Sequence, residues 1–385
     1  MERVILCAFS LVFLMMGTTI TGSDTGKQEE EYRARKLFVF GDSYADTGNL
    51  GKKLGRNIAR SWFEPYGMTF PKKPTGRFSD GKVLTDYLAS LIRISSPIPY
   101  KIRRVGDKLM LLQNGMNFAV SGSGIFDTGN FQRNLSTQID EFQSQIDVGV
   151  FSEHDIKFSV ALIAASGNDY LHFSQLDPNY LLVSIREGNM TMFPYERKND
   201  NHDDVLPVLL QHLHRFMDRL FAQLKADLKR FDRIGVPKVV VTNLHPIQCI
   251  PYYTRQTNYT ICPANISEAV ADHNRRVDRL VEELDGGSNT TTFLSLDVNT
   301  AFSNVLRQVN GAETIKYLLA PCCESSSGTA ACSQVDAQGN KLYRVCRHPE
   351  EHFYWDSAHP TQAGWAAAFQ YLEPSLRSFL LPCPV

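Results

Sequence analysis

Short apolar segments alternate with longer amphipathic ones along most of the chain. Five short segments are predicted strands, at residues 37–40, 116–120, 158–165, 238–242 and 292–296. Residues 205–231, 267–283 and 361–372 instead repeat apolar side chains at intervals of three and four, which is typical of helices that bury one face. Several strands are rich in Val, Ile and Phe on both faces, which indicates a parallel sheet covered on both sides. The pattern therefore predicts a three-layer α/β domain.

Two segments fit neither element type. Residues 171–203 are polar and irregular, and residues 321–358 form a long loop that carries four cysteines. Loops longer than about 15 residues are usually functional or disordered, and the cysteines indicate that the second loop is ordered. No Pro-, Gly- or Ser-rich linker divides the chain, so we expect residues 24–385 to form a single domain.

The beginning of the chain has the pattern of a targeting segment. Arg3 supplies a positive charge, and residues 4–16 are apolar apart from one serine. This run is shorter than the roughly 20 apolar residues that a membrane span needs, and it is typical of a secretory signal. We expect cleavage near Gly22 or Ser23, which makes residues 1–23 a signal peptide and the mature protein secreted, without a stable membrane anchor.

Glycosylation acceptors and cysteines agree with an extracellular destination. Five Asn-x-Ser/Thr sequons are candidate glycosylation sites: Asn134, Asn189, Asn258, Asn265 and Asn289. Of the eight cysteines, Cys7 leaves with the signal peptide, and most of the remaining seven should pair in an oxidising compartment.

The spacing of the cysteines limits the disulfides that can form. Cys249 and Cys262 enclose a short polar loop and are the first predicted pair. Four further cysteines cluster downstream: Cys322, Cys323, Cys332 and Cys346. Adjacent cysteines rarely bond to each other, so the first two of these four should pair with the last two, in either of two ways. Cys383 is left over as a candidate free thiol.

Charge and composition exclude some classes of protein. The chain has 40 Lys and Arg against 41 Asp and Glu, a formal net charge of -1. A nucleic-acid-binding protein normally carries a basic stripe, so this balance argues against a nucleic-acid partner. The hydrophobic content of 43% is that of a globular protein with a sizeable core. Nothing in the sequence indicates the oligomeric state.

Polar residues follow three of the predicted strands. The segment "KLFVFGDSYADTGN" ends its apolar run at Gly41 and then presents Ser43. The second strand is followed by "NFAVSGSG", which contains Gly122, and the third by "SGNDY", which contains Asn168. The carboxyl ends of parallel strands meet at one edge of the sheet, where α/β proteins bind their ligands. We therefore expect these residues to lie together, with Ser43 beside a helix N-terminus that favours negative charge.

Far downstream, "WDSAHPT" holds Asp356 and His359 three positions apart, just before a predicted helix. A serine hydroxyl needs an adjacent base to become a nucleophile, and a histidine can take up and return a proton near neutral pH. His359 would be the base for Ser43, and Asp356 would orient the imidazole. The N–H groups of Ser43 and Gly122 and the side-chain amide of Asn168 would stabilise the oxyanion. Together these residues supply what acyl transfer needs.

Each motif also has a simpler interpretation. A Gly-Asp-Ser sequence after a strand is usually a turn, and Asp-x-x-His before a helix is usually a cap. Asp42 and Asp46 resemble the carboxylate pair of a glycosidase, but we expect them to shape the turn around Ser43. The motif G-x-S-x-G is absent from the chain, which excludes an ordinary α/β-hydrolase nucleophile elbow.

Cys346, His348 and His352 have spacing that could bind a metal ion. In a secreted chain we instead expect a disulfide and two surface histidines, and we predict neither a metal nor a cofactor.

Four blocks in order resemble the plant-type GDSL esterase/lipases of the SGNH hydrolase superfamily. These blocks are "FVFGDSYADTGN", "GMNFAVSGSGIFD", "SGNDY" and "WDSAHPTQAGW". Intervening segments are also similar to the plant branch, including "PYGMTFPKKPTGRFSDGK", "HPIQCIP", "CPANISEAVADHN" and "APCCESSSG". The resemblance extends over essentially the whole mature chain.

The resemblance implies a flavodoxin-like α/β/α sandwich with a five-stranded parallel sheet, and a serine esterase or lipase. By motif position, the nucleophile falls on Ser43, the other oxyanion donors on Gly122 and Asn168, and the acid and base on Asp356 and His359. The usual leucine after the serine is Tyr44 here, which points to Tyr44 as a substrate-binding residue that shapes the mouth of the site.

The expected substrate is a small-molecule or polymer-bound acyl ester: a lipid, an acetylated polysaccharide or a phenolic ester. Two alternatives are an acyltransferase with the same triad, in which an alcohol replaces water, and a non-catalytic carbohydrate- or lipid-binding member of the scaffold. The complete set of catalytic residues argues against the second alternative.

Overall fold

The computed structural model describes nine stretches of the chain, residues 32–103, 112–128, 133–165, 167–172, 205–264, 266–286, 291–307, 314–326 and 331–381. Several predictions lie outside the described residues: the signal peptide, Cys7, Cys383, Asn189, Asn265, Asn289 and most of the 171–203 segment. Across the stretches that are described, no helix combines the length and the apolar character needed to cross a membrane.

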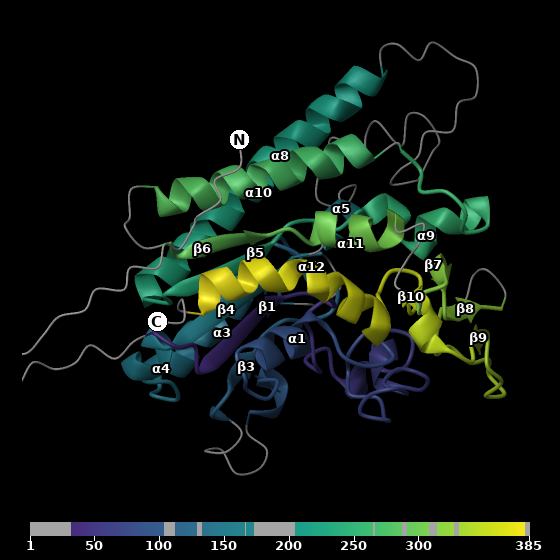
Figure 1. The fold of residues 1–385 in the computed structure, drawn as a ribbon, viewed down its shortest axis with the longest axis horizontal. Coiled ribbons are helices and arrows are strands. Elements are labelled where there is room, and N and C mark those ends of the chain that lie inside the picture. Colours follow the sequence, from purple (N-terminus) through teal and green to yellow (C-terminus); the bar gives the residue numbers. More distant parts are fainter. Residues whose placement is uncertain are drawn as a thin grey trace, which may run out of the picture. The chain divides into compact units, whose positions relative to one another are not determined.

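A parallel sheet of six strands forms the centre, in the order β2-β3-β1-β4-β5-β6. Figure 1 labels β1, β3, β4, β5 and β6 of this sheet. The strands are β1 Lys36–Gly41, β2 Ile98–Pro99, β3 Gly115–Asn117, β4 Ser159–Ala164, β5 Lys238–Thr242 and β6 Phe293–Leu296. The expected strand count of five is therefore wrong by one. The additional strand is β2, an edge strand of two residues that includes a proline and has no apolar run to predict it.

Helices cover both faces of this sheet. Those of ten residues or more are α3 Leu135–Asp147, α8 Val205–Ile234, α10 Ser267–Asp285, α11 Val298–Arg307 and α12 Gln362–Leu380. The shorter ones are α1 Leu84–Leu91, α4 Glu153–Lys157, α5 Asn168–Leu171 and α9 Pro251–Thr254. Six 3₁₀ turns complete the described helices: η1 Lys52–Leu54, η2 Arg60–Trp62, η3 Tyr100–Ile102, η4 Ile247–Cys249, η5 Arg255–Thr257 and η6 Pro349–Glu351.

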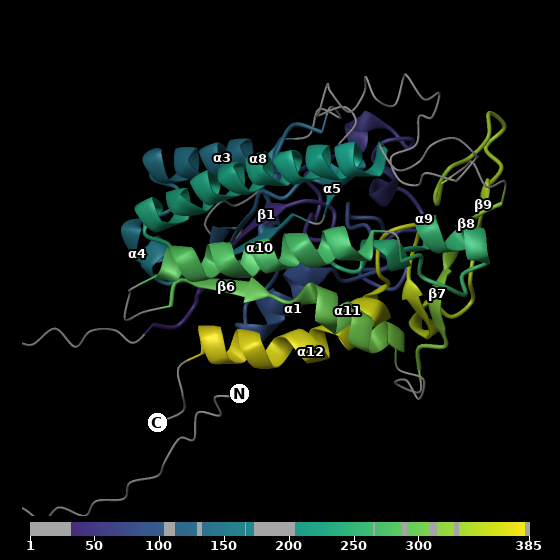
Figure 2. The same ribbon diagram turned by 90° about the horizontal axis from the view of Figure 1, so that it is seen from above.

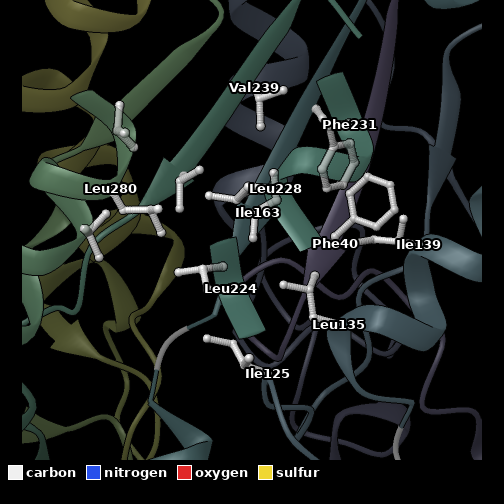
Figure 3. Close-up of a cluster of buried hydrophobic side chains, with 14 of the residues drawn as sticks. Phe40, Ile125, Leu135, Ile139, Ile163, Leu224, Leu228, Phe231, Val239 and Leu280 are labelled. Atoms are coloured by element: carbon white, nitrogen blue, oxygen red, sulfur yellow. The ribbon is translucent and has the colours of Figure 1, made fainter. Parts of the chain in front are cut away.

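The alternation of side chains along each strand divides the core into two layers. Phe38 and Phe40 of β1 belong to the cluster that contains α3, α8 and α10, whereas Leu37 and Val39 belong to the cluster with α1, α11 and α12. Figure 2 shows these helix groups on opposite sides of the sheet. In the first layer, Phe40 packs with its ring centroid 4.9 Å from that of Phe231 on α8 (Figure 3). The predicted three-layer α/β/α architecture is thus confirmed.

Helix α12 extends beyond its predicted end. The sequence pattern predicts its end at Leu372, two residues before Pro374, because proline normally terminates a helix. The helix instead continues to Leu380, since Leu376 and Leu380 remain fully buried in the second layer. Burial of these side chains outweighs the one backbone hydrogen bond that the proline removes.

The described parts of the predicted loop, residues 321–326 and 331–358, contain short strands. They hold the antiparallel pair β8 Cys323–Ser325 and β9 Tyr343–Val345, and β10 His352–Tyr354, which pairs with β7 Tyr317–Pro321. Two disulfides, Cys322–Cys346 and Cys323–Cys332, close the loop, which is one of the two predicted arrangements. The structure also contains the predicted Cys249–Cys262 disulfide.

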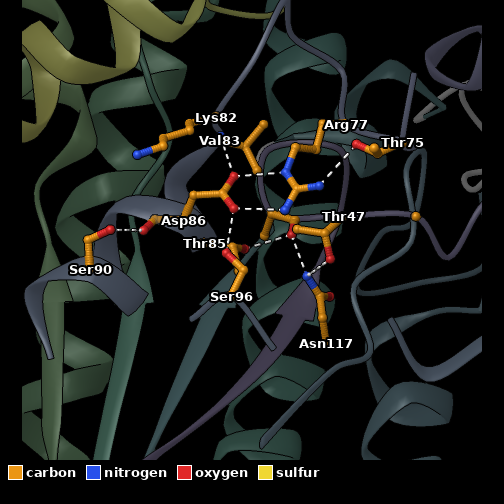
Figure 4. Close-up of polar contacts among 12 residues, drawn as sticks. Thr47, Thr75, Arg77, Lys82, Val83, Thr85, Asp86, Ser90, Ser96 and Asn117 are labelled. Atoms are coloured by element: carbon orange, nitrogen blue, oxygen red, sulfur yellow. Dashed lines mark hydrogen bonds and ion pairs between the residues drawn. The ribbon is translucent and has the colours of Figure 1, made fainter. Parts of the chain in front are cut away.

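A buried ion pair fastens α1 to the segment before it (Figure 4). The guanidinium of Arg77 donates to both carboxylate oxygens of Asp86, at 2.9 and 2.8 Å. Asp86 also accepts from the N–H of Val83 at 2.9 Å and from the hydroxyl of Ser96. Burial raises the pKa of Asp86, but the charge of Arg77 and these hydrogen bonds outweigh it, so the pKa lies below its ordinary value.

Candidate active site

The three strands at the centre of the sheet deliver the predicted residues to one cavity. Ser43 follows β1, Gly122 follows β3 and Asn168 follows β4, and β1 lies between the other two strands. All three residues, together with His359, line a cavity of about 290 Å³. The chain passes from one side of β1 to the other between β3 and β4, so the cavity lies at the point where the strand order reverses.

Ser43 and His359 meet within hydrogen-bonding distance although they are 316 positions apart. The Oγ of Ser43 lies 2.8 Å from Nε2 of His359. On the other side of the ring, Nδ1 lies 2.7 Å from Oδ1 and 3.0 Å from Oδ2 of Asp356. This geometry gives the tautomer with a proton on Nδ1 and a free Nε2 lone pair, which can accept the serine proton.

Asp356 is buried and held by four donors. Its Oδ1 accepts the N–H groups of Ala358 and His359, each at 2.9 Å, and its Oδ2 accepts the hydroxyl of Tyr66 at 2.7 Å. Burial raises the pKa of Asp356, but the charge and hydrogen bond of His359 and the other donors lower it by more than burial raises it. The pKa of Asp356 is therefore below its ordinary value. The carboxylate therefore stays ionised and can stabilise an imidazolium.

Gly41 allows the chain to turn at the end of β1. Its φ is +119°, and a Cβ at this position would lie 1.9 Å from the carbonyl oxygen of Ala164 on β4. The side chain of Gln138 on α3 accepts the N–H of Gly41 at 2.7 Å and donates to its carbonyl at 2.9 Å. No helix directly follows Ser43: the N–H groups of Ala45 and Asp46 close a turn on the carbonyl of residue 42, at 3.1 and 2.9 Å.

Asp46 joins the serine turn to the segment after β3. Its carboxylate accepts the N–H groups of Gly48 and Asn49, at 2.7 and 2.6 Å, and both the N–H and the hydroxyl of Ser121, at 2.9 and 2.8 Å. Asp46 is fully buried, as its structural role requires. Ser121 precedes Gly122, whose φ of +87° turns its backbone at the cavity. The expectation that Asp42 and Asp46 shape the turn agrees with these contacts.

The candidate oxyanion donors differ in their present partners. Within the described residues, the N–H groups of Ser43 and Gly122 donate to no other protein atom. The side-chain amide of Asn168 donates to the carbonyl of Ser123 at 2.9 Å and to Oδ2 of Asp42 at 3.2 Å. The second of these contacts is the longer one, and its hydrogen is the one that an oxyanion could take over.

Tyr44 lines the cavity but is only 5% exposed. Its hydroxyl donates to the carbonyl of Ala358 at 2.8 Å, and its ring centroid lies 5.8 Å from that of His359. The side chain therefore links the turn that holds Ser43 to the loop that carries Asp356 and His359. Contact with substrate remains a prediction for this residue.

The other candidate residues that the structure describes do not line this cavity. Asn134 is half-buried and caps α3 by accepting the N–H of Thr137 at 2.9 Å, and Asn258 is exposed. Cys346 forms the predicted disulfide, and His348 is exposed as expected. The prediction of a second surface histidine is wrong, because His352 is buried with Nδ1 3.0 Å from the carbonyl oxygen of Ala320. No cluster of three or more metal-ligating side chains occurs in the part of the chain that is described.

Comparison with known proteins places the chain in a family. The model of the family described as GDSL-like Lipase/Acylhydrolase matches residues 37–372, and the chain belongs to this family of carboxylic ester hydrolases. GDSL esterase/lipase At5g03610 of Arabidopsis thaliana is 36% identical over 366 residues, which cover 94% of this chain and 92% of the relative. GDSL esterase/lipase At3g09930 of the same plant is 35% identical and covers 90% of this chain and 89% of its own.

Among solved structures, that of LAE5, an alpha/beta hydrolase enzyme from a lake metagenome, aligns with 90% of this chain and 97% of its own, at 14% identity and a TM-score of 0.34. The predictions of the family and of the class of enzyme are confirmed by the family model and the plant relatives.

Four residues that the structure brings to the site were not among the predicted functional residues. Tyr66 and His245 lie in segments that carry the family resemblance, but nothing in their spacing indicates contact with Asp356 or with the cavity. Gln138 lies on an amphipathic helix, and its only sequence signal is that a polar residue occupies a position on the buried face. Asp169 follows Asn168 and accepts the N–H groups of residues 125 and 126, at 2.9 and 2.8 Å.

Proposed function

We propose that this protein is a secreted serine esterase that hydrolyses carboxylic esters through an acyl-enzyme on Ser43. The observation that carries this proposal is the continuous relay from the Ser43 hydroxyl through His359 to Asp356, with contacts of 2.8 and 2.7 Å. Ser43 Oγ attacks the ester carbonyl and passes its proton to Nε2 of His359. The imidazolium is stabilised by the ionised Asp356 and then protonates the leaving alcohol.

The negative charge that develops on the carbonyl oxygen needs donors already in position. The N–H groups of Ser43 and Gly122, which have no partner among the described residues, support this role. Asn168 supplies a third donor when its longer contact to Asp42 gives way. In the second half of the reaction, His359 takes a proton from water as the water attacks the acyl-enzyme carbonyl. When the tetrahedral intermediate collapses, the imidazolium returns this proton to Ser43 Oγ, and the carboxylic acid is released.

Secretion is supported by two features of the chain. Residues 1–23 have the pattern of a signal peptide, and six cysteines form three disulfides, which persist in oxidising compartments. Sequons at the exposed Asn258 and the half-buried Asn134 are compatible with glycosylation.

The test of the catalytic assignment replaces Ser43 by alanine and measures hydrolysis of p-nitrophenyl butyrate. We expect Ser43→Ala to abolish turnover and labelling by a fluorophosphonate probe while the protein remains folded. Ser357 is a second serine that lines the same cavity, so Ser357→Ala is the matched control and should retain activity. Substantial hydrolysis by the Ser43→Ala protein would refute the assignment.

The oxyanion assignment is tested separately with Asn168→Ala. We expect kcat to fall about a hundredfold or more, because one preorganised donor is lost while the nucleophile and base remain. Circular dichroism and unfolding in urea serve as the check on the fold. A loss below threefold would remove Asn168 from the oxyanion hole.

A further inference from the structure

The cavity contains a second histidine that the proposed reaction does not use. His245 follows β5, is 4% exposed and lines the same cavity as Ser43 and His359. Its ring centroid lies 4.8 Å from that of Tyr44 and 5.7 Å from that of Phe302. Tyr44 is the residue after the proposed nucleophile, so its side chain lies between the imidazole of His245 and the turn that holds Ser43.

The two ring nitrogens of His245 have different surroundings. Nδ1 is sealed from solvent and has no hydrogen-bond partner among the described residues. Orphaned N–H groups in protein interiors are rarer than orphaned acceptors, so the favoured tautomer carries its proton on Nε2. Nε2 is then an N–H donor, and the cavity is where it can meet an acceptor.

His245 also stays neutral at working pH. Burial lowers its pKa to about 3, and the nearby charge of His359 lowers it as well. A ring with this pKa cannot shuttle protons at neutral pH, and it adds no positive charge when His359 becomes an imidazolium. What it offers a ligand is one fixed, uncharged hydrogen-bond donor.

The neighbours of His245 in the cavity wall are apolar. Leu244, Ile247 and Ile250 line the cavity on the same segment, and Ile266 and Val270 continue the apolar wall at the start of α10. An acyl chain is the part of an ester that such a wall accommodates. A single polar group within this wall costs free energy unless the ligand offers it a partner.

We propose that His245 is a specificity-determining residue that donates a hydrogen bond from Nε2 to an oxygen carried by the acyl chain. The preferred substrates are then acyl esters with a hydroxyl, ether or keto oxygen close to the scissile carbonyl, rather than plain hydrocarbon chains. This inference rests on the proposed function, because it takes the cavity to be the acyl site of an esterase.

The test compares matched ester pairs in which an ether oxygen replaces one methylene. p-Nitrophenyl methoxyacetate is paired with the butyrate, and p-nitrophenyl 3-methoxypropanoate with the pentanoate. The ratio of kcat/KM within each pair is measured for the wild type and for His245→Phe, which keeps an aromatic ring beside Tyr44. Comparing the two proteins cancels the difference in intrinsic ester reactivity.

In at least one pair, we expect His245→Phe to lower the ether-to-hydrocarbon ratio by roughly threefold to tenfold, the value of one neutral hydrogen bond. Ile247→Leu changes the wall without touching the donor and should leave the ratio unchanged. If His245→Phe does not fold, His245→Leu is measured in its place.

An unchanged ratio in both pairs would overturn the proposal. If kcat/KM also falls equally on ether and hydrocarbon esters, His245 only supports the triad. Either result with an inactive Ser43→Ala protein leaves the esterase assignment intact. An active Ser43→Ala protein refutes that assignment instead.

Discussion

Gln138 fixes the end of the strand that leads to the nucleophile, and its replacement tests how much that connection contributes to stability. The fully buried side chain accepts the N–H of Gly41 at 2.7 Å and donates to the carbonyls of Gly41 and Arg133, both at 2.9 Å, and to the hydroxyl of Ser123 at 3.2 Å. Gln138→Met keeps the length of the side chain and removes all four bonds.

The expected cost follows from what each partner retains. The carbonyl of Gly41 still accepts the N–H of Val120 at 2.9 Å, and the carbonyl of Arg133 still accepts the hydroxyl of Ser123 at 2.8 Å. The N–H of Gly41 keeps no partner and is buried, which costs about 1–3 kcal/mol. With the smaller loss of the shared bonds, we expect the free energy of unfolding to fall by about 3 kcal/mol.

Equilibrium unfolding in urea measures this change as a lower midpoint at constant m value. Gln145 is the matched control, because it is also buried on α3 and makes no side-chain hydrogen bond within the described residues. Gln145→Met should change the free energy of unfolding by less than 1 kcal/mol or so. If both variants cost the same, or Gln138→Met costs nothing, the reasoning about the strand end is wrong.

Two further predictions concern buried charges. Arg77→Ala should lower the free energy of unfolding, measured in urea, by about 3–5 kcal/mol, because it leaves the carboxylate of Asp86 buried without its cation. Arg377 is exposed and pairs with Glu373, so Arg377→Ala should lower the free energy of unfolding by about 0.5 kcal/mol or less. Similar losses for the two variants would contradict this prediction. Burial raises the pKa of Asp169 to about 6 despite hydrogen bonds from residues 126 and 125. The folded protein therefore holds a proton that the unfolded chain releases near pH 4. As a result, the free energy of unfolding falls as the pH rises from about 4 to about 6. Relative to Asp169→Asn, the wild type should lose up to about 3 kcal/mol between pH 4 and pH 7, and a difference that does not vary with pH would refute the shift.

The main elements of the fold were predictable because they depend on local patterns. Strand β5 lies where its apolar run predicts it, and α8 and α10 follow their stripes to within three residues at each end. Strand β2 and the end of α12 were missed because tertiary contacts decide them. The edge pairing of Ile98 and Pro99 and the burial of Leu376 and Leu380 have no counterpart in the local sequence.

The candidate site divides in the same way. Ser43, His359 and Asp356 are recognisable because the proposed chemistry requires particular residue types at strand ends and in one downstream motif. Tyr66 and Gln138 are not recognisable, because a tyrosine that donates to Asp356 and a glutamine that holds a strand end acquire these roles only through contacts between distant segments. Polar side chains that support a site through long-range contacts are therefore the part of the site that the sequence does not indicate.

The separation of Ser43 and His359 along the chain has a consequence for biosynthesis. A ribosome makes the nucleophile among the first tenth or so of the polypeptide and the base near the finish, 316 positions later. A nascent chain that has already folded its first strands still lacks the imidazole, so under the proposed mechanism it cannot yet cleave esters. Under the proposed mechanism, the protein can hydrolyse esters only after the loop that carries His359 has been made. A chain that ends before this loop is therefore expected to be inactive.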